Sequence, residues 1–140
     1  MEMAQTILVL EDDPDRVRRF RACFATLSPQ AEVIIWRDAK QMIRECGAYL
    51  DRCALICLDH DLVPENGDSP DPGDGLEVAK FLGPLVPKCP IVIHSSNTDR
   101  AYQMLGELQL HSCEVMTVLP LGADWVEGYW WPKVEALFRR

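Results

Sequence analysis

The sequence predicts a three-layer α/β fold built on a doubly wound, five-stranded parallel sheet. Two observations predict it. Short apolar runs, typical of strands buried on both faces of a sheet, alternate with segments in which apolar residues recur at helical spacing. Acidic and polar residues also follow three of these runs directly, where an open α/β sheet places its ligand site. Right-handed crossovers would then cover both faces of the sheet with helices.

The predicted strands are short runs of mostly branched apolar residues. The first of them, ILVL, is continuously apolar, which indicates burial on both sides. In chain order, the five runs are residues 7–10, 32–36, 54–58, 90–94 and 114–119.

The predicted helices begin at recognisable N-terminal signals. Asp13 and Pro14 open the first helix, which Ser28 and Pro29 end and whose arginines lie mostly opposite its apolar face. Asp38 caps the second, which extends to Leu50. The third is expected to stop at Gly83 and Pro84, and Pro132 lies in the first turn of the last. The last three helices are predicted over residues 76–82, 98–108 and 132–138.

Length and charge limit the function classes. The chain has 140 residues, which predicts one domain over residues 1–140. Its net charge is −8, from 22 acidic and 14 basic residues, so broad nucleic-acid binding is not expected. No apolar run approaches the ~20 residues that span a bilayer. The first six residues are too polar for a signal peptide. We therefore expect no membrane association and a cytoplasmic location.

The six cysteines show neither a CxxC pair nor zinc-ligand spacing. Several lie within apolar stretches, which favours buried free thiols over a disulfide framework or a metal site. They are Cys23, Cys46, Cys53, Cys57, Cys89 and Cys113.

Acidic residues follow two of the predicted strands. Glu11 and Asp12 come directly after the first strand, and Asp59 and Asp61 after the third. Carboxylates that converge at neighbouring strand ends need a counter-charge, and Mg²⁺ or Mn²⁺ prefers such ligands. We predict a metal site of Glu11, Asp12 and Asp59, with Asp61 as a further ligand or a loop-capping residue. For Asp13, helix capping is the better interpretation.

Histidine and hydroxyl side chains border the same site. The candidate catalytic residues are Asp59, His60 and His94, because histidine transfers protons near neutral pH. Hydroxyl and amide donors, and the start of a helix, suit phosphate oxygens. The alternatives are structural hydrogen bonding by the histidines and helix capping by a hydroxyl or amide side chain. The candidate phosphate-binding residues are Ser95, Ser96 and Asn97.

Other polar and aromatic residues are expected to serve structure. His111 is predicted on the surface, and Arg100 in a solvated first turn rather than on a phosphate. The loop over residues 63–74 is rich in Pro, Gly and Asp, a composition that favours mobility. We expect an aromatic cluster near the C-terminus to pack against the core rather than stack on a nucleobase. It comprises Trp125, Tyr129, Trp130 and Trp131.

Three segments resemble a response-regulator receiver domain. They are ILVLEDDP (residues 7–14), LICLDHDL (residues 55–62) and DGLEV (residues 74–78). The resemblance implies a flavodoxin-like fold in which Glu11 and Asp12 help to hold magnesium. It also implies that Asp59 matches the phosphorylated aspartate and that Ser95 contacts the phosphoryl group.

The chain departs from that pattern at three places. Receivers carry a lysine and a proline after the fifth strand, where this chain has Leu119 and Pro120; the loop after Asp59 is longer, and histidines enter the site. LDHDL (residues 58–62) together with HSSN (residues 94–97) resembles the divergent cyclic-phosphate processing receiver domains. That resemblance implies binding or hydrolysis of cyclic phosphates on nucleotides or RNA ends.

Two alternatives remain open. A phosphodonor could phosphorylate Asp59, as in a two-component response regulator, although the missing lysine argues against normal switching. A degenerate receiver would only bind a protein partner, which the intact acids argue against. Receivers often pair through their last helices, which makes a homodimer an alternative to a monomer; the sequence does not decide between the two.

Overall fold

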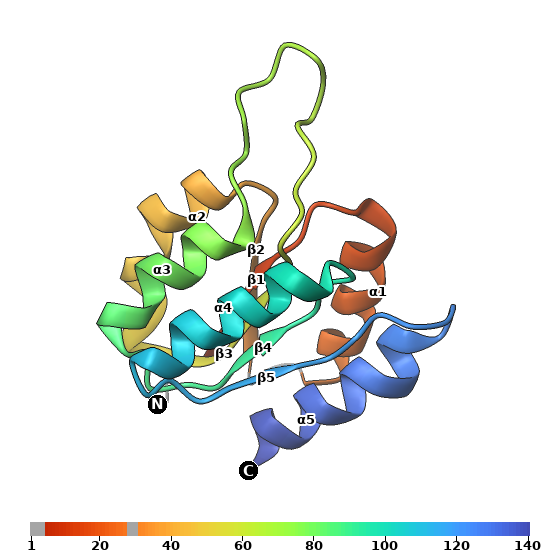
Figure 1. The fold of residues 1–140 in the computed structure, drawn as a ribbon. Helices are drawn as coiled ribbons and strands as arrows, with labels where there is room; N and C mark the ends of the chain where they lie inside the picture. Colours follow the sequence, from red (N-terminus) through yellow and green to blue (C-terminus); the bar gives the residue numbers. More distant parts are fainter. Residues whose placement is uncertain (1–4, 28–30) are drawn as a thin grey trace.

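The computed structural model describes residues 5–27 and 31–140, which form a five-stranded parallel sheet in the order β2-β1-β3-β4-β5 (Figure 1). This order confirms the predicted doubly wound α/β fold, with its switch point between β1 and β3. The strands are β1 (Gln5–Leu10), β2 (Ala31–Trp36), β3 (Cys53–Leu58), β4 (Ile91–Ile93) and β5 (Val115–Thr117).

Helices cover both faces of the sheet. Helices α2, α3 and α4 lie on one face, and α1 and α5 lie on the other (Figure 1). Their bounds are α1 (Pro14–Phe24), α2 (Ala39–Glu45), α3 (Gly75–Leu85), α4 (Thr98–Leu110) and α5 (Trp131–Arg139). In the described chain, no helix has both the length and the apolar character needed to cross a bilayer.

Alternating side chains divide the core into two layers. Leu8 and Leu10 of β1 pack with α2, α3 and α4, whereas Ile7 and Val9 pack with α1 and α5. Because successive side chains of a strand point to opposite faces, the residue after each strand has a predictable side. Glu11 continues the phase of Val9 and so faces α1 and α5.

The predicted helix starts are confirmed. Asp13 caps α1 by accepting hydrogen bonds from the N–H groups of Asp15 and Arg16, at 2.9 and 3.2 Å. Asp38 caps α2 by accepting one from Gln41 at 2.9 Å. The predicted stop at Ser28 and Pro29 lies outside the described residues.

Several boundaries differ from expectation. Helix α2 ends at Glu45 rather than at Leu50, and a 3₁₀ helix, Cys46–Arg52, follows it, because Gly47 is a poor α-helix former. Helix α3 does not stop at Gly83 but continues through Pro84 to Leu85. Pro84 has no N–H to donate, and the helix ends directly after Leu85, where Val86 adopts a left-handed φ of 46° and donates to the Gly83 carbonyl at 3.0 Å. Strand β5 is shorter than residues 114–119, and α5 follows a π-helical segment, Val126–Trp130, that the sequence pattern did not predict.

A long loop joins β3 to α3 and stands away from the body at the carboxyl edge of the sheet (Figure 1). Its base is closed by a hydrogen bond from the Gly75 N–H to the His60 carbonyl, at 3.0 Å. A Cβ atom at Gly75 would lie 2.0 Å from the Asp59 carbonyl oxygen. Only glycine therefore allows α3 to begin so close to the end of β3.

The cysteines are free thiols, as predicted. Five of them are buried and Cys53 is partly exposed.

Candidate functional site

Three carboxylates meet where β1 and β3 end. Each of Glu11, Asp12 and Asp59 offers an oxygen that lies within 4.8 Å of the other two. Glu11 and Asp59 are only 1% and 5% exposed, whereas Asp12 is half-buried. The sequence prediction that these acids converge is thus confirmed.

Hydrogen bonds hold each carboxylate in place. Glu11 Oε2 accepts the N–H groups of Asp12 and Asp13, at 3.0 and 3.1 Å. Asp59 Oδ1 accepts the N–H of His60 at 2.7 Å. Asp12 Oδ2 accepts the N–H of Val63 at 2.6 Å, which ties the long loop to the acids.

The acids differ in their affinity for protons. Burial, reinforced by the nearby charge of Glu11, raises the pKa of Asp59 to about 8. Burial also raises the pKa of Asp12. Burial acts on Glu11 in the same direction, but the hydrogen bond and charge of His94 outweigh it and lower the Glu11 pKa to about 2. The raised pKa of Asp59 indicates that the positive charge near the cluster does not balance three carboxylates, and a divalent cation would supply the remainder.

His94 lies on the same side of the sheet as the acids. Its side chain is fully buried, and its Nε2 atom lies 3.1 Å from Glu11 Oε1. The ring packs edge-on against Phe20, with 5.1 Å between centroids, and near-parallel to Trp125 at 6.1 Å. Nδ1 has no hydrogen-bond partner among the described residues. His94 is thus held against Glu11 by an aromatic pocket.

His60 lies on the opposite face, because it directly follows Asp59 in the chain. Its Nδ1 atom is 2.7 Å from Asp61 Oδ1, and its Nε2 atom is 3.7 Å from Asp74 Oδ2. The Asp61 carboxylate also accepts a hydrogen bond from Asn97 Nδ2 at 3.3 Å. The structure therefore places His60 and Asp61 in a second polar group beside the carboxylate cluster, and Asp61 is not one of its three members.

The predicted phosphate-binding residues occupy three different environments. Ser95 is 2% exposed, and its hydroxyl oxygen accepts the Asn97 N–H at 3.1 Å. Ser96 is exposed. Asn97 is the N-cap of α4 and accepts the Arg100 N–H at 3.2 Å. Capping by Asn97 is thus confirmed, and Ser95 lies nearest the end of β4.

Arg16 also borders the acids, which was not predicted from the sequence. Its Nη1 atom lies 3.6 Å from Glu11 Oε1 and 3.8 Å from Asp59 Oδ2. The guanidinium stacks 5.1 Å from the ring centroid of Trp125. We predicted that the α1 arginines lie mostly away from the core. The sequence did contain an indication of this position. Helix α1 begins at Pro14, two residues after Asp12, so its first turn borders the acids.

The remaining polar predictions have mixed outcomes. Leu119, where receivers carry lysine, is 47% exposed. Arg100 is exposed in the first turn of α4, as predicted. His111 is not fully on the surface but half-buried, with its ring against Gly83 of α3.

The predicted packing of the aromatic cluster is confirmed for Trp125 and Trp130, which are 4% and 0% exposed. Trp130 stacks on Phe20 with 4.1 Å between centroids. Tyr129 is the exposed member, at 57%.

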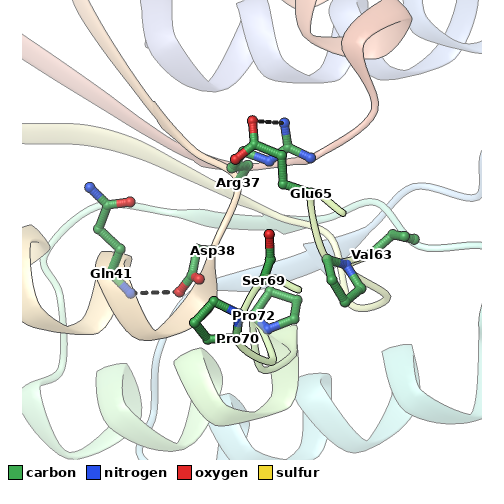
Figure 2. A pocket seen from close by; sticks show the side chains of 9 residues that line it. Arg37, Asp38, Gln41, Val63, Glu65, Ser69, Pro70 and Pro72 are labelled. Carbon is green, nitrogen blue, oxygen red and sulfur yellow. Dashed lines mark hydrogen bonds and ion pairs between the residues drawn. The ribbon is translucent and has the colours of Figure 1, made fainter. Parts of the chain in front are cut away.

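A groove of about 190 Å³ lies beside the acids, between the start of α2 and the long loop (Figure 2). It begins at Val63, whose N–H binds Asp12. Arg37 and Glu65 form an ion pair across it at 3.8 Å, and Ser69 and Gln41 also line it (Figure 2).

Comparisons with solved structures agree with this architecture. The phosphorylated cyanobacterial phytochrome response regulator RcpA superposes with a TM-score of 0.66 at 22% identity, covering 98% of this chain and 95% of its own. The response regulator domain of Thermotoga maritima CheB gives 0.65 at 15% identity, covering 98% and 95%. A chain of the Borrelia burgdorferi CheX–CheY complex with BeF₃ and Mg²⁺ gives 0.65 at 14% identity, covering 96% and 89%. These TM-scores establish a shared fold, and at such low identity they establish the fold alone.

No curated protein sequence matches the chain. The family model of the cyclic-phosphate processing receiver domain matches residues 6–110. This segment contains the three acids, both histidines of the site and the Ser95–Asn97 turn. The chain therefore belongs to the family of cyclic-phosphate processing receiver domains.

Proposed function

We propose that the chain binds a divalent cation at Glu11, Asp12 and Asp59 and there binds and hydrolyses a cyclic phosphate. The observation that carries this proposal is the carboxylate cluster, in which the buried Asp59 has a pKa of about 8. Three carboxylates short of positive charge are a donor set that suits Mg²⁺ or Mn²⁺. When bound, such an ion polarises a phosphoryl oxygen and lowers the pKa of a coordinated water.

The neighbouring side chains suit a phosphate ester. Ser95 lies at the end of β4, and the α4 N-terminus that follows it favours anions. The groove beside Asp12 offers Arg37, Gln41 and Ser69 to the remainder of the ester (Figure 2). The phosphate and its substituent would then lie on adjacent parts of one edge.

The two histidines would serve differently. His94 contacts Glu11 and is enclosed by aromatic rings, so it would hold Glu11 in position as a metal ligand. Its Nε2 atom would be the first candidate for transferring a proton during the reaction. His60 is oriented through Nδ1 by Asp61, and its Nε2 atom has no hydrogen-bond partner among the described residues. His60 is therefore the second candidate for donating a proton to the leaving oxygen.

The test is turnover of 2′,3′-cyclic nucleotides and of RNA oligonucleotides that end in a 2′,3′-cyclic phosphate, with Mg²⁺ or with EDTA. We expect Mg²⁺-dependent opening of the ring that Asp59→Asn abolishes. His60→Ala and His94→Ala are expected to lower turnover, whereas His111→Ala, a variant of the histidine that packs against Gly83, leaves it unchanged. Absence of turnover on both substrate classes would overturn the hydrolytic proposal.

Phosphorylation of Asp59 is the second candidate function. The carboxylate lies within the acid cluster, and the fold is that of the phosphorylated regulator RcpA. Incubation with acetyl phosphate and Mg²⁺, followed by intact mass, would give a phosphate adduct that Asp59→Asn lacks. Sedimentation of the same samples would distinguish a homodimer from a monomer.

A further inference from the structure

Arg16 owes its position to the cap of α1. Asp13 accepts the Arg16 N–H at 3.2 Å, so the first helical turn begins directly after the acid pair. Helical side chains lean back toward the N-terminus of their helix, which brings the guanidinium toward Glu11 and Asp59. Only 23% of the side chain is exposed.

A rigid aromatic surface supports the guanidinium. Arg16 lies 5.1 Å from the ring centroid of Trp125, a distance at which a cation is attracted to an aromatic face. Trp125 is 4% exposed and packs perpendicular to Phe20, with 6.0 Å between centroids. The stacking fixes one side of the guanidinium plane and leaves its N–H groups at the edge.

Those N–H groups are not used by the protein. The contacts to Glu11 and Asp59, at 3.6 and 3.8 Å, are longer than hydrogen bonds, and the Arg16 side chain makes no hydrogen bond within residues 5–27 and 31–140. Arg19, one turn further along the same helix, instead binds both carboxylate oxygens of Glu127, at 2.6 and 3.0 Å. Within the described residues, the five N–H donors of Arg16 thus have no hydrogen-bond acceptor, and the guanidinium interacts with the two acids through charge alone.

No other cation among the described residues is so placed. Arg16 is the one arginine or lysine there with a nitrogen within 4.0 Å of Glu11, Asp12 or Asp59. Leu119, at the end of β5, is apolar and 47% exposed. A phosphate at the metal would add negative charge beside three carboxylates, so a further cation at this place would favour its binding.

We propose that Arg16 is the cationic phosphate-binding side chain of this site, in addition to Ser95 and the start of α4. Its planar fork would bind two phosphate oxygens, and Trp125 positions it for this contact. The inference rests on the metal site proposed above but does not require hydrolysis.

The test separates metal binding from phosphate binding by titration calorimetry. Mg²⁺ is titrated first, and inorganic phosphate is then titrated into the Mg²⁺-loaded protein. The variants are Arg16→Ala and Arg16→Lys, with Arg18→Ala as the matched control, because Arg18 is 73% exposed and pairs with Asp15 on the outside of α1.

We expect Arg16→Ala to weaken phosphate binding about ten- to a hundredfold, as loss of a charged hydrogen-bonding partner does. Mg²⁺ affinity should stay the same or rise, because a positive charge near the acids is removed. Arg16→Lys should recover part of the loss, and Arg18→Ala should match the wild type. If Arg16→Ala does not fold, Arg16→Gln, which keeps most of the length, provides the same comparison.

Three outcomes would overturn parts of this reasoning separately. Unchanged phosphate affinity in Arg16→Ala would refute the role of Arg16 and leave the metal site intact. A wild-type protein that binds Mg²⁺ but not phosphate would likewise refute the role of Arg16 and leave the metal site intact. Absence of Mg²⁺ binding in the wild type would overturn the proposed function itself.

Discussion

Replacing Asp59 with asparagine should change how the stability of the metal-free protein depends on pH. The Asp59 pKa is raised from 3.8 to about 8 by burial and by Glu11. The folded protein therefore binds a proton at this carboxyl over a pH range in which the unfolded chain has lost it. Because the pKa of this carboxyl is higher in the folded protein than in the unfolded chain, its protonation stabilises the folded state. This stabilisation is fully present below pH 3.8 and is lost as the pH rises through about 8.

The size of the effect follows from the shift. The free energy of unfolding should fall by up to about 1.4 kcal/mol per pH unit between the two pKa values. Between pH 5 and pH 8 the sum is at most about 4 kcal/mol. Asparagine does not ionise, so Asp59→Asn should remove this slope and be the more stable protein at pH 8.

The assay is urea unfolding in EDTA at pH 5, 6, 7 and 8 for both proteins. The difference between the two profiles isolates Asp59 and the groups coupled to it, because every distant group titrates alike in both. Parallel profiles would refute the argument that Asp59 is buried without sufficient positive charge. A wild type that gains stability relative to the variant as pH rises would refute it more strongly.

Three further predictions follow from the same contacts. Mg²⁺ at a hundred times its dissociation constant should stabilise the folded protein by about 2.7 kcal/mol, measured as a higher urea midpoint. Binding should be weaker at pH 6 than at pH 8, because the ion must displace the Asp59 proton. Glu11→Gln should lose most of this stabilisation, and an equal gain in the variant would contradict the proposed metal site. Gly75→Ala should destabilise the protein by about 3 kcal/mol or prevent folding, because the added Cβ meets the Asp59 carbonyl. Gly106→Ala, whose added Cβ would meet no atom within 4 Å, should be neutral or slightly stabilising. Equal urea midpoints for the two variants would show that the close approach at Gly75 does not exist. The Sγ atoms of Cys53 and Cys89 lie 3.1 Å apart, so diamide, which accepts the two thiol hydrogens, should form a Cys53–Cys89 disulfide and leave the buried Cys57 free. Peptide mass mapping would detect the cross-linked pair. Oxidation of Cys57 before this pair would contradict the arrangement of these thiols.

The acid cluster was predictable because it depends on connectivity alone. Parallel strands place their carboxyl ends at one edge, so residues that follow β1 and β3 must meet there whatever the details of packing. The capping roles of Asp13 and Asp38 were predictable for a similar reason, since the cap lies within one turn of the N–H groups that it accepts.

The separation of the two histidines needed one further step. His60 directly follows Asp59, and the two-residue period of a strand places neighbours on opposite faces. His94 is in phase with Val92, which packs on the same side as Val9 and Glu11. Adjacency of the strand ends alone predicts one shared location for both histidines, whereas the alternation of side chains places them on different faces.

The contact between Arg16 and Trp125 could not be predicted from local sequence patterns. Their contact joins residues that are more than a hundred positions apart, and it depends on the π-helical segment that positions Trp125 before α5. An arginine in the first turn of an amphipathic helix is usually solvated, so only the tertiary structure distinguishes Arg16 from Arg18. The continuation of α3 through Pro84 is similar, since it depends on the left-handed conformation of Val86.

The closed base of the long loop has a consequence for how this chain can vary. The Gly75–His60 hydrogen bond joins the two stems before the loop leaves the body, and the Val63–Asp12 hydrogen bond holds the first stem again beyond that base. Each doubling of such a loop costs only about 0.6 kcal/mol of closure entropy. Insertions and deletions at residues 66–68, between the parts of the loop that line the groove, would therefore leave the acids where they are and change only the outer end of the loop.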